Sequence, residues 1–234
     1  MQISATVRNT AVTNSVYLTV AKSALFVRLG TGNTVIVDDN GTTYHHPYSV
    51  VVTDSSGNAA VGKVINLSLT PVAFAKGWWW WDGTTWNQVV ESPSPYCISE
   101  DWANENGILD PTEDVNLNGV LDPGNIASVP GTVTIGSDGT ASFDVTYARE
   151  FAQWVQVRLT AAAGVAGTEG TDTVYFWLPI SVDAVKSTGL VPGYVSHWGD
   201  GWNASSTIPS GLAAMPGYVS QSPLSSATTC DDLY

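Results

Sequence analysis

The chain has 234 residues, enough for one large β domain or for one domain and a fragment of another. Its formal net charge is −13, and only 12% of its residues are charged. Nucleic acids and anionic membranes are negatively charged themselves, so neither is an expected partner of this acidic chain. Abundant Ser, Thr, Gly and Asn in place of charged residues are typical of bacterial extracellular β-proteins.

The first 20 residues alternate polar and apolar side chains, without the basic start and apolar core of a signal peptide. The sequence contains no run of 18 apolar residues, so direct membrane insertion is not expected. We expect residues 1–22 to form strands of a preceding domain, or strands exchanged with a neighbouring copy. On this interpretation the chain is a piece of a longer exported protein.

Short alternating segments follow along the chain, separated by turn signals such as Asp39-Asn40-Gly41 and Ser137-Asp138-Gly139. No segment has a convincing amphipathic helical pattern. Many short strands at this spacing predict an all-β protein built as an antiparallel sandwich. The segments expected to form strands are 3–7, 16–20, 25–29, 48–52, 61–69, 133–135, 141–147, 154–161 and 174–182.

Four consecutive tryptophans, 78–81, open a region that breaks the strand pattern and extends over residues 77–129. Asp82-Gly83 predicts a hairpin turn that brings Trp81 close to Trp86. Neighbours in a strand point to opposite faces, so the four rings cannot all enter one core. Trp79, Trp81 and Trp86 are therefore candidates for stacking on a sugar or anchoring a partner. Alternatively, the hairpin folds onto the sandwich and its rings are covered.

Two copies of Asn-x-Asn-Gly-x-Leu-Asp lie twelve residues apart between positions 104 and 122. Calcium takes six to eight oxygen ligands from alternate residues of a tight loop with glycine at the sharp turn. The second copy places Asp114, Asn116, Asn118, the Val120 carbonyl and Asp122 at ligand positions 1, 3, 5, 7 and 9. Gly119 is at position 6, and Asn125 stands at position 12, where an EF-hand has Glu.

The first copy offers Asn104, Asn106, the Ile108 carbonyl, Asp110 and Glu113 at positions 3, 5, 7, 9 and 12. Trp102 occupies position 1 and cannot bind a metal, but Asp101 lies next to it. Seven carboxylates fall within residues 100–122 without a Lys or Arg, so their repulsion favours a bound cation over an acidic loop without metal. Pro111 and Pro123 follow the loops and exclude the helices of an EF-hand.

Cys97 and Cys230 are the only cysteines of the chain. In an oxidising compartment they are expected to form a disulfide; two free thiols are the alternative. Residues 184–234 are rich in Gly, Pro and Ser, and we expect them to form an irregular tail packed on the domain.

Catalytic patterns are weak in this sequence. The three histidines, His45, His46 and His197, occur without a His-Glu-x-x-His motif, and there is no Gly-x-Ser-x-Gly. Glu150 and Glu169 could serve a glycosidase only if one cleft held both. We therefore expect no enzymatic activity.

The chain from residue 25 to residue 230 resembles bacterial immunoglobulin-like domains of the invasin and intimin type, similar to Big-1 domains. The residues that carry the resemblance are 29–33, 48–58, 76–77, Cys97, 100–101, both Asn-Gly-x-Leu-Asp loops, 123–125, 137–141, Tyr147, 154–155, 159–161 and 222–223 before Cys230. The resemblance implies an immunoglobulin-like β-sandwich over residues 23–183 with a calcium-loop insertion. The chain departs from the pattern at Trp102, where related loops have Asp, and in its Trp-rich stretch.

Together these features predict a non-catalytic, calcium-binding module of a bacterial cell-surface or extracellular protein. Its expected role is structural or adhesive, as an adhesin, a stalk unit or a filament subunit that self-associates or adjoins similar domains. Host molecules or glycans are the expected ligands. The alternative is a carbohydrate-binding module that uses the hairpin of residues 78–86.

Overall fold

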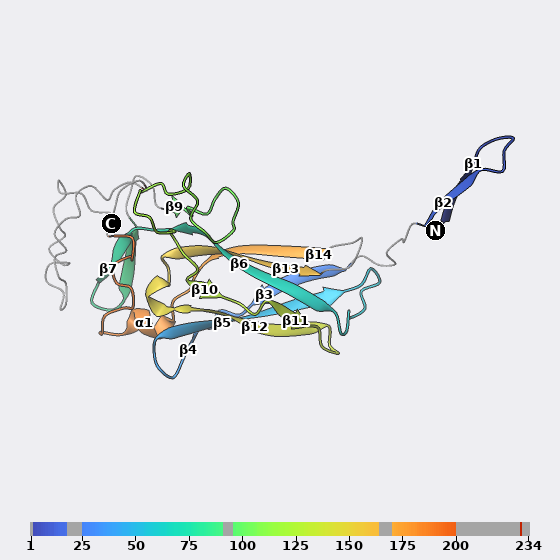
Figure 1. Cartoon of the computed structure of the whole chain (residues 1–234). Helices are drawn as coiled ribbons and strands as arrows, with labels where there is room; N and C mark the ends of the chain where they lie inside the picture. The colour runs from blue at the N-terminus through green and yellow to red at the C-terminus, as the bar shows by residue number, and fades with distance from the viewer. Residues whose placement is uncertain (1, 18–24, 91–95, 164–169, 200–229, 231–234) are drawn as a thin grey trace.

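A computed structural model describes residues 2–17, 25–90, 96–163, 170–199 and 230, and this part of the chain is an all-β protein of antiparallel sheets (Figure 1). Two five-stranded sheets pack face to face as the layers of a sandwich, and two separate hairpins accompany them. The predicted all-β class is therefore confirmed. No helix in the described residues is long and apolar enough to cross a membrane.

The first sheet is centred on two long strands with the order β10-β12-β5-β3. Its strands are β3 (Phe26–Thr31), β4 (Ile36–Val37), β5 (Thr43–Thr53), β10 (Ala127–Ser128) and β12 (Thr140–Ala148). β4 also pairs with β5. In the register of β5 and β12, Tyr48 lies opposite Phe143, and the two rings stack with centroids 6.0 Å apart.

The second sheet has the order β11-β6-β13-β14, and β9 pairs with the end of β6. Its strands are β6 (Val64–Phe74), β9 (Cys97–Ile98), β11 (Thr132–Thr134), β13 (Val155–Ala163) and β14 (Gly170–Trp177). The register of β6 and β13 shifts between Gln156 and Val157, as at a β-bulge.

The core lies between the sheets because alternate residues of the long strands face inward. Val50 and Val52 of β5 and Val157 and Leu159 of β13 are completely buried. Burying a side chain of this size stabilises the fold by about 1.5–3 kcal/mol. Trp154, just before β13, is also fully buried, and its indole N–H donates to the Gly193 carbonyl at 2.6 Å.

The tryptophan run forms the expected hairpin of β7 (Gly77–Trp81) and β8 (Trp86–Val90), with Trp81 paired to Trp86. Asp82 closes the turn, because its carboxylate accepts hydrogen bonds from the amides of Thr84 and Thr85, each at 2.8 Å. These bonds to the charged form hold the pKa of Asp82 well below its ordinary value.

The strand expected over residues 174–182 is shorter in the structure, and a helix follows it. β14 ends at Trp177, and a short helix α1 (Val182–Lys186) follows, whose first turn is capped by the Ser181 hydroxyl. Pro179 lacks an amide hydrogen and so cannot continue the ladder. A 3-10 helix, η1 (Arg149–Phe151), similarly ends β12.

Residues 191–199 cover the same end of the sandwich, as expected for the beginning of the tail. The Trp79 amide donates to the Tyr194 carbonyl at 2.8 Å, and the Ser196 amide donates to the Gly77 carbonyl at 2.9 Å. Gly77 adopts a positive φ of 150°, and a Cβ at this position would collide with the Val89 carbonyl oxygen. Residues 200–229 and 231–234 of the tail lie outside the described part of the chain.

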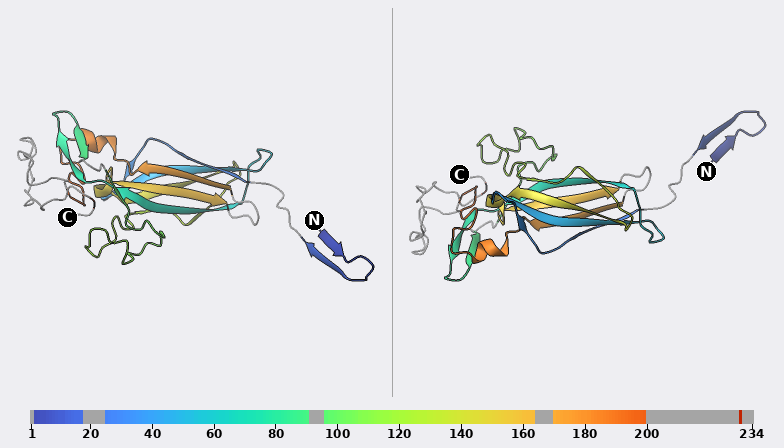
Figure 2. Two further views of the ribbon diagram at one scale, coloured as in Figure 1. Left: turned by 90° about the horizontal axis from the view of Figure 1, so that it is seen from above. Right: turned by 90° about the horizontal axis from the view of Figure 1, so that it is seen from below.

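The N-terminal residues form a hairpin of β1 (Gln2–Thr6) and β2 (Thr13–Tyr17) that stands apart from the sandwich (Figures 1 and 2). The two predicted strands therefore pair with each other, with Ile3 opposite Val16. Residues 18–20 of the second predicted strand lie outside the described residues. Exchange with a neighbouring copy stays a prediction.

Candidate metal centre

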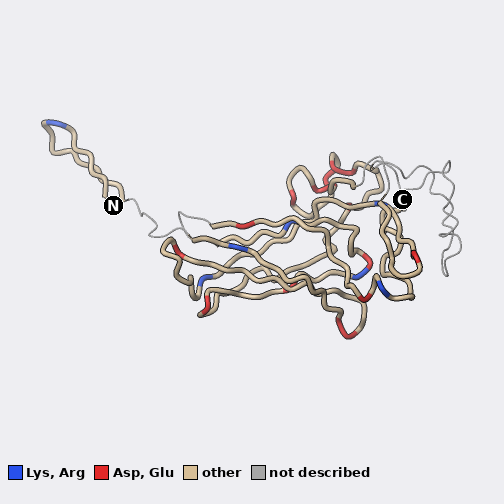
Figure 3. Tube along the Cα trace, turned by 180° about the vertical axis from the view of Figure 1, so that it is seen from behind, with Lys and Arg blue, Asp and Glu red and all other residues tan. Residues whose placement is uncertain are grey.

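The two acidic loops occupy residues 99–126, between β9 and β10. Figure 2 shows them projecting from one side of the sandwich, while the β7–β8 hairpin and α1 project from the opposite side of the same end. Acidic residues gather on this insertion, as the red segments of Figure 3 show. The loops are anchored at their start by the pairing of β9 with β6.

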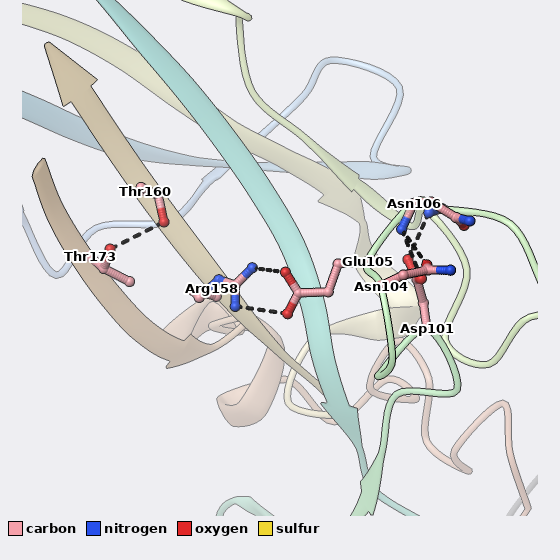
Figure 4. Close-up of polar contacts among 8 residues, drawn as sticks. Asp101, Asn104, Glu105, Asn106, Arg158, Thr160 and Thr173 are labelled. Carbon is pink, nitrogen blue, oxygen red and sulfur yellow. Dashed lines mark hydrogen bonds and ion pairs between the residues drawn. The ribbon is translucent and has the colours of Figure 1, made fainter. Parts of the chain in front are cut away.

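Asp101 organises the first loop. Its two carboxylate oxygens accept hydrogen bonds from the amides of Asn106, at 2.9 Å, and Gly107, at 2.7 Å. The Asn104 side-chain oxygen also accepts from the Asn106 amide, at 3.1 Å. Figure 4 shows these three polar side chains converging within the loop.

Asp114 plays the same role in the second loop. Its carboxylate accepts from the amides of Asn118 and Gly119, each at 3.1 Å, and the Asn116 side-chain oxygen accepts from the Asn118 amide at 3.0 Å. By this equivalence Asp101, and not Trp102, stands at position 1 of the first loop. Trp102 is a one-residue insertion with 59% of its surface exposed.

The backbone conformations of the loops also match. The residues at position 4, Glu105 and Leu117, have positive φ angles of 54° and 58°. The glycines at position 6, Gly107 and Gly119, have φ angles of 76° and 74°. Left-handed backbone is rare for residues other than glycine, so the shared pattern shows that both sequences fold into one loop type.

Each loop is closed by a glutamate, but one glutamate follows the loop that it closes and the other precedes it. Glu113 follows the first loop and accepts from the amides of Ala103 and Asp110, at 3.0 and 3.2 Å. Glu100 precedes both loops, yet it accepts from the amides of Val115 and Asp122 in the second loop, each at 3.0 Å.

Glu100 thus occupies the place that sequence spacing gives to Asn125. A Cβ on Gly107 would lie 3.4 Å from the Asn125 side-chain nitrogen, so Asn125 lies against the first loop. Sequence reasoning missed Glu100 because the loop that it closes begins at Asp114, 14 residues further along the chain. The signal that could have identified it is the repeated Glu-Asp pair, at 100–101 and 113–114.

Asparagine side chains connect the remaining carboxylates to the loops. In the first loop Asn104 and Asn106 donate to Asp110, at 2.7 and 3.3 Å. In the second loop the equivalent residues donate to the same oxygen of Asp122, at 3.0 Å from Asn116 and 2.9 Å from Asn118. The Asp at position 9 of each loop therefore lies beside the amides of positions 3 and 5.

Several of these carboxylates are buried. Glu113 is completely buried, Glu100 is 3% exposed and Asp101 is 8% exposed. Within the described residues none of these three forms an ion pair. Burial raises the pKa of the Glu100 carboxyl, although backbone hydrogen bonds oppose that shift. Buried carboxylates are costly unless a cation or hydrogen bonds compensate them.

Two contacts tie the loops to the rest of the protein. Arg158 on β13 forms a two-fold ion pair with Glu105 of the first loop, as Figure 4 shows, and one of its nitrogens lies 2.9 Å from Glu105 Oε1. This pair lowers the pKa of Glu105 and raises that of Arg158. The buried Trp198 indole N–H donates to Asp122 Oδ1 of the second loop at 2.9 Å.

The Arg158–Glu105 pair yields a testable expectation. Arg158→Met keeps the aliphatic stem on the sheet but removes the ion pair, and should lower the free energy of unfolding by up to about 1 kcal/mol. The measurement is chemical unfolding at low and high salt. The difference between variant and parent should shrink as salt screens the exposed pair; a salt-independent difference would mean that packing, and not charge, holds the loop.

The donor set fits a cation that prefers oxygen. Within the described residues, no group of three or more His, Cys, Asp or Glu side chains is arranged to hold a metal ion. Asparagine and main-chain oxygens make up half of each candidate set, and calcium accepts them as readily as carboxylates. The loops offer no His or Cys, which zinc prefers.

The tryptophan candidates lie in a different environment from the exposed platform considered from sequence. Trp79 is 4% exposed and Trp86 is 7% exposed, while Trp81 is half-buried against Trp86. The Trp86 indole N–H donates to the carbonyls of Ser187 and Gly189, each at 3.0 Å. The hairpin is therefore folded onto the domain, and Trp80, which is 43% exposed, is its outward ring.

The predicted disulfide between Cys97 and Cys230 is confirmed, with the two Cα atoms 5.4 Å apart. Cys97 is buried on β9, three residues before Glu100. The bond thus ties Cys230 to β9, the strand that leads into the candidate metal loops.

The histidines have structural contacts. His46 packs edge-on against Tyr48 and lies 3.3 Å from the Thr34 carbonyl, and burial lowers its pKa. His197 packs edge-on against Phe151. Glu150 lies in η1, and Glu169 falls outside the described residues.

Comparison of the chain with protein-family models, with curated proteins and with solved structures gives no match. The resemblance to bacterial immunoglobulin-like domains therefore stays a prediction.

Proposed function

We propose that the chain is a non-catalytic immunoglobulin-like module of a bacterial surface or extracellular protein, in which two calcium ions stiffen the insertion. The observation that carries this proposal is the equivalence of the two loops, each with an aspartate at its start and a buried glutamate closing it. Two antiparallel layers and a disulfide support the immunoglobulin-like and extracellular parts of the proposal.

Each ion would draw three carboxylates, which do not form a metal-holding group in the structure, together with two amide oxygens and one main-chain carbonyl. The first set is Asp101, Asn104, Asn106, Ile108, Asp110 and Glu113. The second set is Asp114, Asn116, Asn118, Val120, Asp122 and Glu100. Six hard oxygen donors match the lower limit of calcium coordination. A bound calcium ion supplies positive charge that offsets the mutual repulsion of the carboxylates.

The two sites would be coupled, because Glu100 lies next to the first residue of the first loop in the sequence but closes the second loop. Ordering either loop positions the carboxylate that the other loop requires: Glu100 is covalently joined to Asp101, and Glu113 to Asp114. Calcium binding to one loop would therefore favour binding to the other.

An insertion stiffened by calcium on a two-layer β-sandwich fits a structural or adhesive role in a stalk, adhesin or filament. Calcium sites in extracellular modules have dissociation constants of about 10⁻⁴–10⁻³ M. Such sites fill at millimolar calcium and empty at much lower concentrations. The module would thus be stiff outside the cell.

Calcium should raise the thermal stability of the whole domain. For a site with a dissociation constant of about 1 mM, 10 mM free calcium adds about 1.4 kcal/mol per ion to the free energy of unfolding. Thermal melts in EDTA and in calcium measure this difference, and calorimetric titration counts the ions. Two ions are expected; identical melts with no heat of binding would refute the proposal.

A further inference from the structure

A small pocket lies at the end of the sandwich, on the side of β8 and the end of β14. It has a volume of about 280 Å³ and is lined by Ala75, Gln88, Val90, Tyr96, Gln153 and Trp177. None of these residues belongs to the acidic loops. This volume lies just below the range of typical ligand sites, about 300–1,000 Å³, and therefore suits a small ligand.

Two aromatic rings form walls of this pocket. Tyr96 and Trp177 lie with ring centroids 6.3 Å apart and planes inclined by 66°. Tyr96 is 49% exposed and Trp177 is half-buried, so part of each residue is accessible to a ligand. Aromatic faces of this kind carry negative charge density and attract the slightly positive C–H groups of a ligand.

Two glutamine amides supply the polar part of the pocket. Gln88 Nε2 donates to the Gln153 carbonyl at 2.8 Å, and Gln153 Nε2 donates to the Leu178 carbonyl at 3.4 Å. Each amide is thereby oriented by one of its two N–H groups. The second N–H and the carbonyl oxygen of each side chain leave both donors and acceptors for a ligand.

The backbone at Gln153 is unusual and holds this arrangement. Gln153 has a positive φ of 67°, a conformation rare for residues with a side chain. Its amide N–H donates to the Leu178 carbonyl at 2.7 Å, which anchors the residue to the segment that follows Trp177. Left-handed residues other than glycine persist where the surrounding structure imposes them, often at binding sites.

We propose that this pocket binds one unit of a neutral saccharide. A sugar ring offers C–H groups to the aromatic walls and hydroxyls, which both donate and accept, to the two amides. All six lining side chains are uncharged, which disfavours a phosphorylated or acidic ligand. Gln88 and Val90 of β8 line the pocket, but no tryptophan of the β7–β8 hairpin does. The pocket is also independent of the calcium proposal.

Saturation-transfer NMR with glucose, galactose, mannose and N-acetylglucosamine, each added alone to the full chain, tests the proposal. At least one sugar should give a saturable signal, in EDTA as well as in calcium. Trp177→Ala and Gln88→Met should each weaken binding by about tenfold, which corresponds to the loss of one ring contact or one oriented amide.

Trp80→Ala is the matched control, since it removes an exposed tryptophan outside the pocket and should leave binding unchanged. Gln88→Met preserves side-chain length, so it tests the pocket even if Trp177→Ala fails to fold. Absence of saturable binding for all four sugars would overturn the proposal, as would a signal that survives both pocket substitutions. Either result leaves the calcium melts unaffected, so the two proposals fail separately.

Discussion

Replacing Glu100 with Gln is expected to abolish about half of the calcium-dependent stabilisation, although Glu100 lies outside both repeated motifs. The substitution removes one of three carboxylates from the second candidate site, and we expect calcium affinity there to fall by about 100-fold, or about 2.7 kcal/mol. The amide nitrogen of Gln also cannot accept the Asp122 N–H, so the protein in EDTA should lose about 1–3 kcal/mol.

The informative quantity is therefore the difference between melts with and without calcium. If Glu100 were purely structural, its replacement would lower the melting temperatures with and without calcium equally and would leave this difference intact. Glu150→Gln, which changes an exposed carboxylate in η1, serves as the matched control and should alter neither melt.

Asn125→Ala separates the structural assignment from sequence spacing. Spacing places Asn125 at position 12 of the second loop, whereas the fold puts Glu100 there. The alanine variant should keep the calcium increment and two binding events. If Asn125→Ala abolished one calcium-binding event while Glu100→Gln retained both, the assignment of Glu100 to the second loop would be wrong.

Calcium titration of the Glu100→Gln variant also tests whether the two sites are coupled. In the Glu100→Gln variant the first loop keeps all six candidate donors, yet it loses a neighbour that calcium would order. Its affinity should also decrease, by less than that of the second loop. An unchanged first site would show that the loops bind independently.

Sequence periodicity predicted the long strands of both sheets, but it missed the two-residue strands β4, β9 and β10 and could not show the contacts between the loops. The alternation of β5 and β13 marks their buried faces directly, because side chains of a strand point alternately to its two sides. The α1 region was missed because Val182 extends an apolar run, while the terminating Pro179 and the capping Ser181 act through local geometry.

The metal loops illustrate the same limit at the level of a site. The spacing from Asn104 to Asp110 and from Asn116 to Asp122 identifies the loop type. Spacing alone cannot show that Asp101 takes position 1, because the extra residue, Trp102, is accommodated by the backbone between Asp101 and Asn104. Nor can spacing assign Glu100, whose partners belong to the other loop.

Removing the disulfide should produce the largest loss of stability. The bond between Cys97 and Cys230 closes a loop with a sequence separation of 133 residues, for which the chain-entropy relation gives about 5 kcal/mol. A paired Cys97→Ser and Cys230→Ser variant should therefore lose a large part of the 5–15 kcal/mol that typical domains possess. Denaturant unfolding of the oxidised, reduced and double-serine proteins measures this loss.

The reduced protein and the double-serine variant should also bind calcium more weakly. Cys97 is buried on β9, three residues before Glu100, so releasing Cys230 loosens the strand from which the closing glutamate extends. Because β9 pairs with β6 through only two residues, the disulfide is a substantial part of its attachment. Unchanged calcium titrations after reduction, together with a large loss of stability, would show that β6 alone positions Glu100. Weaker binding would make the disulfide a support of the metal loops as well as of the fold.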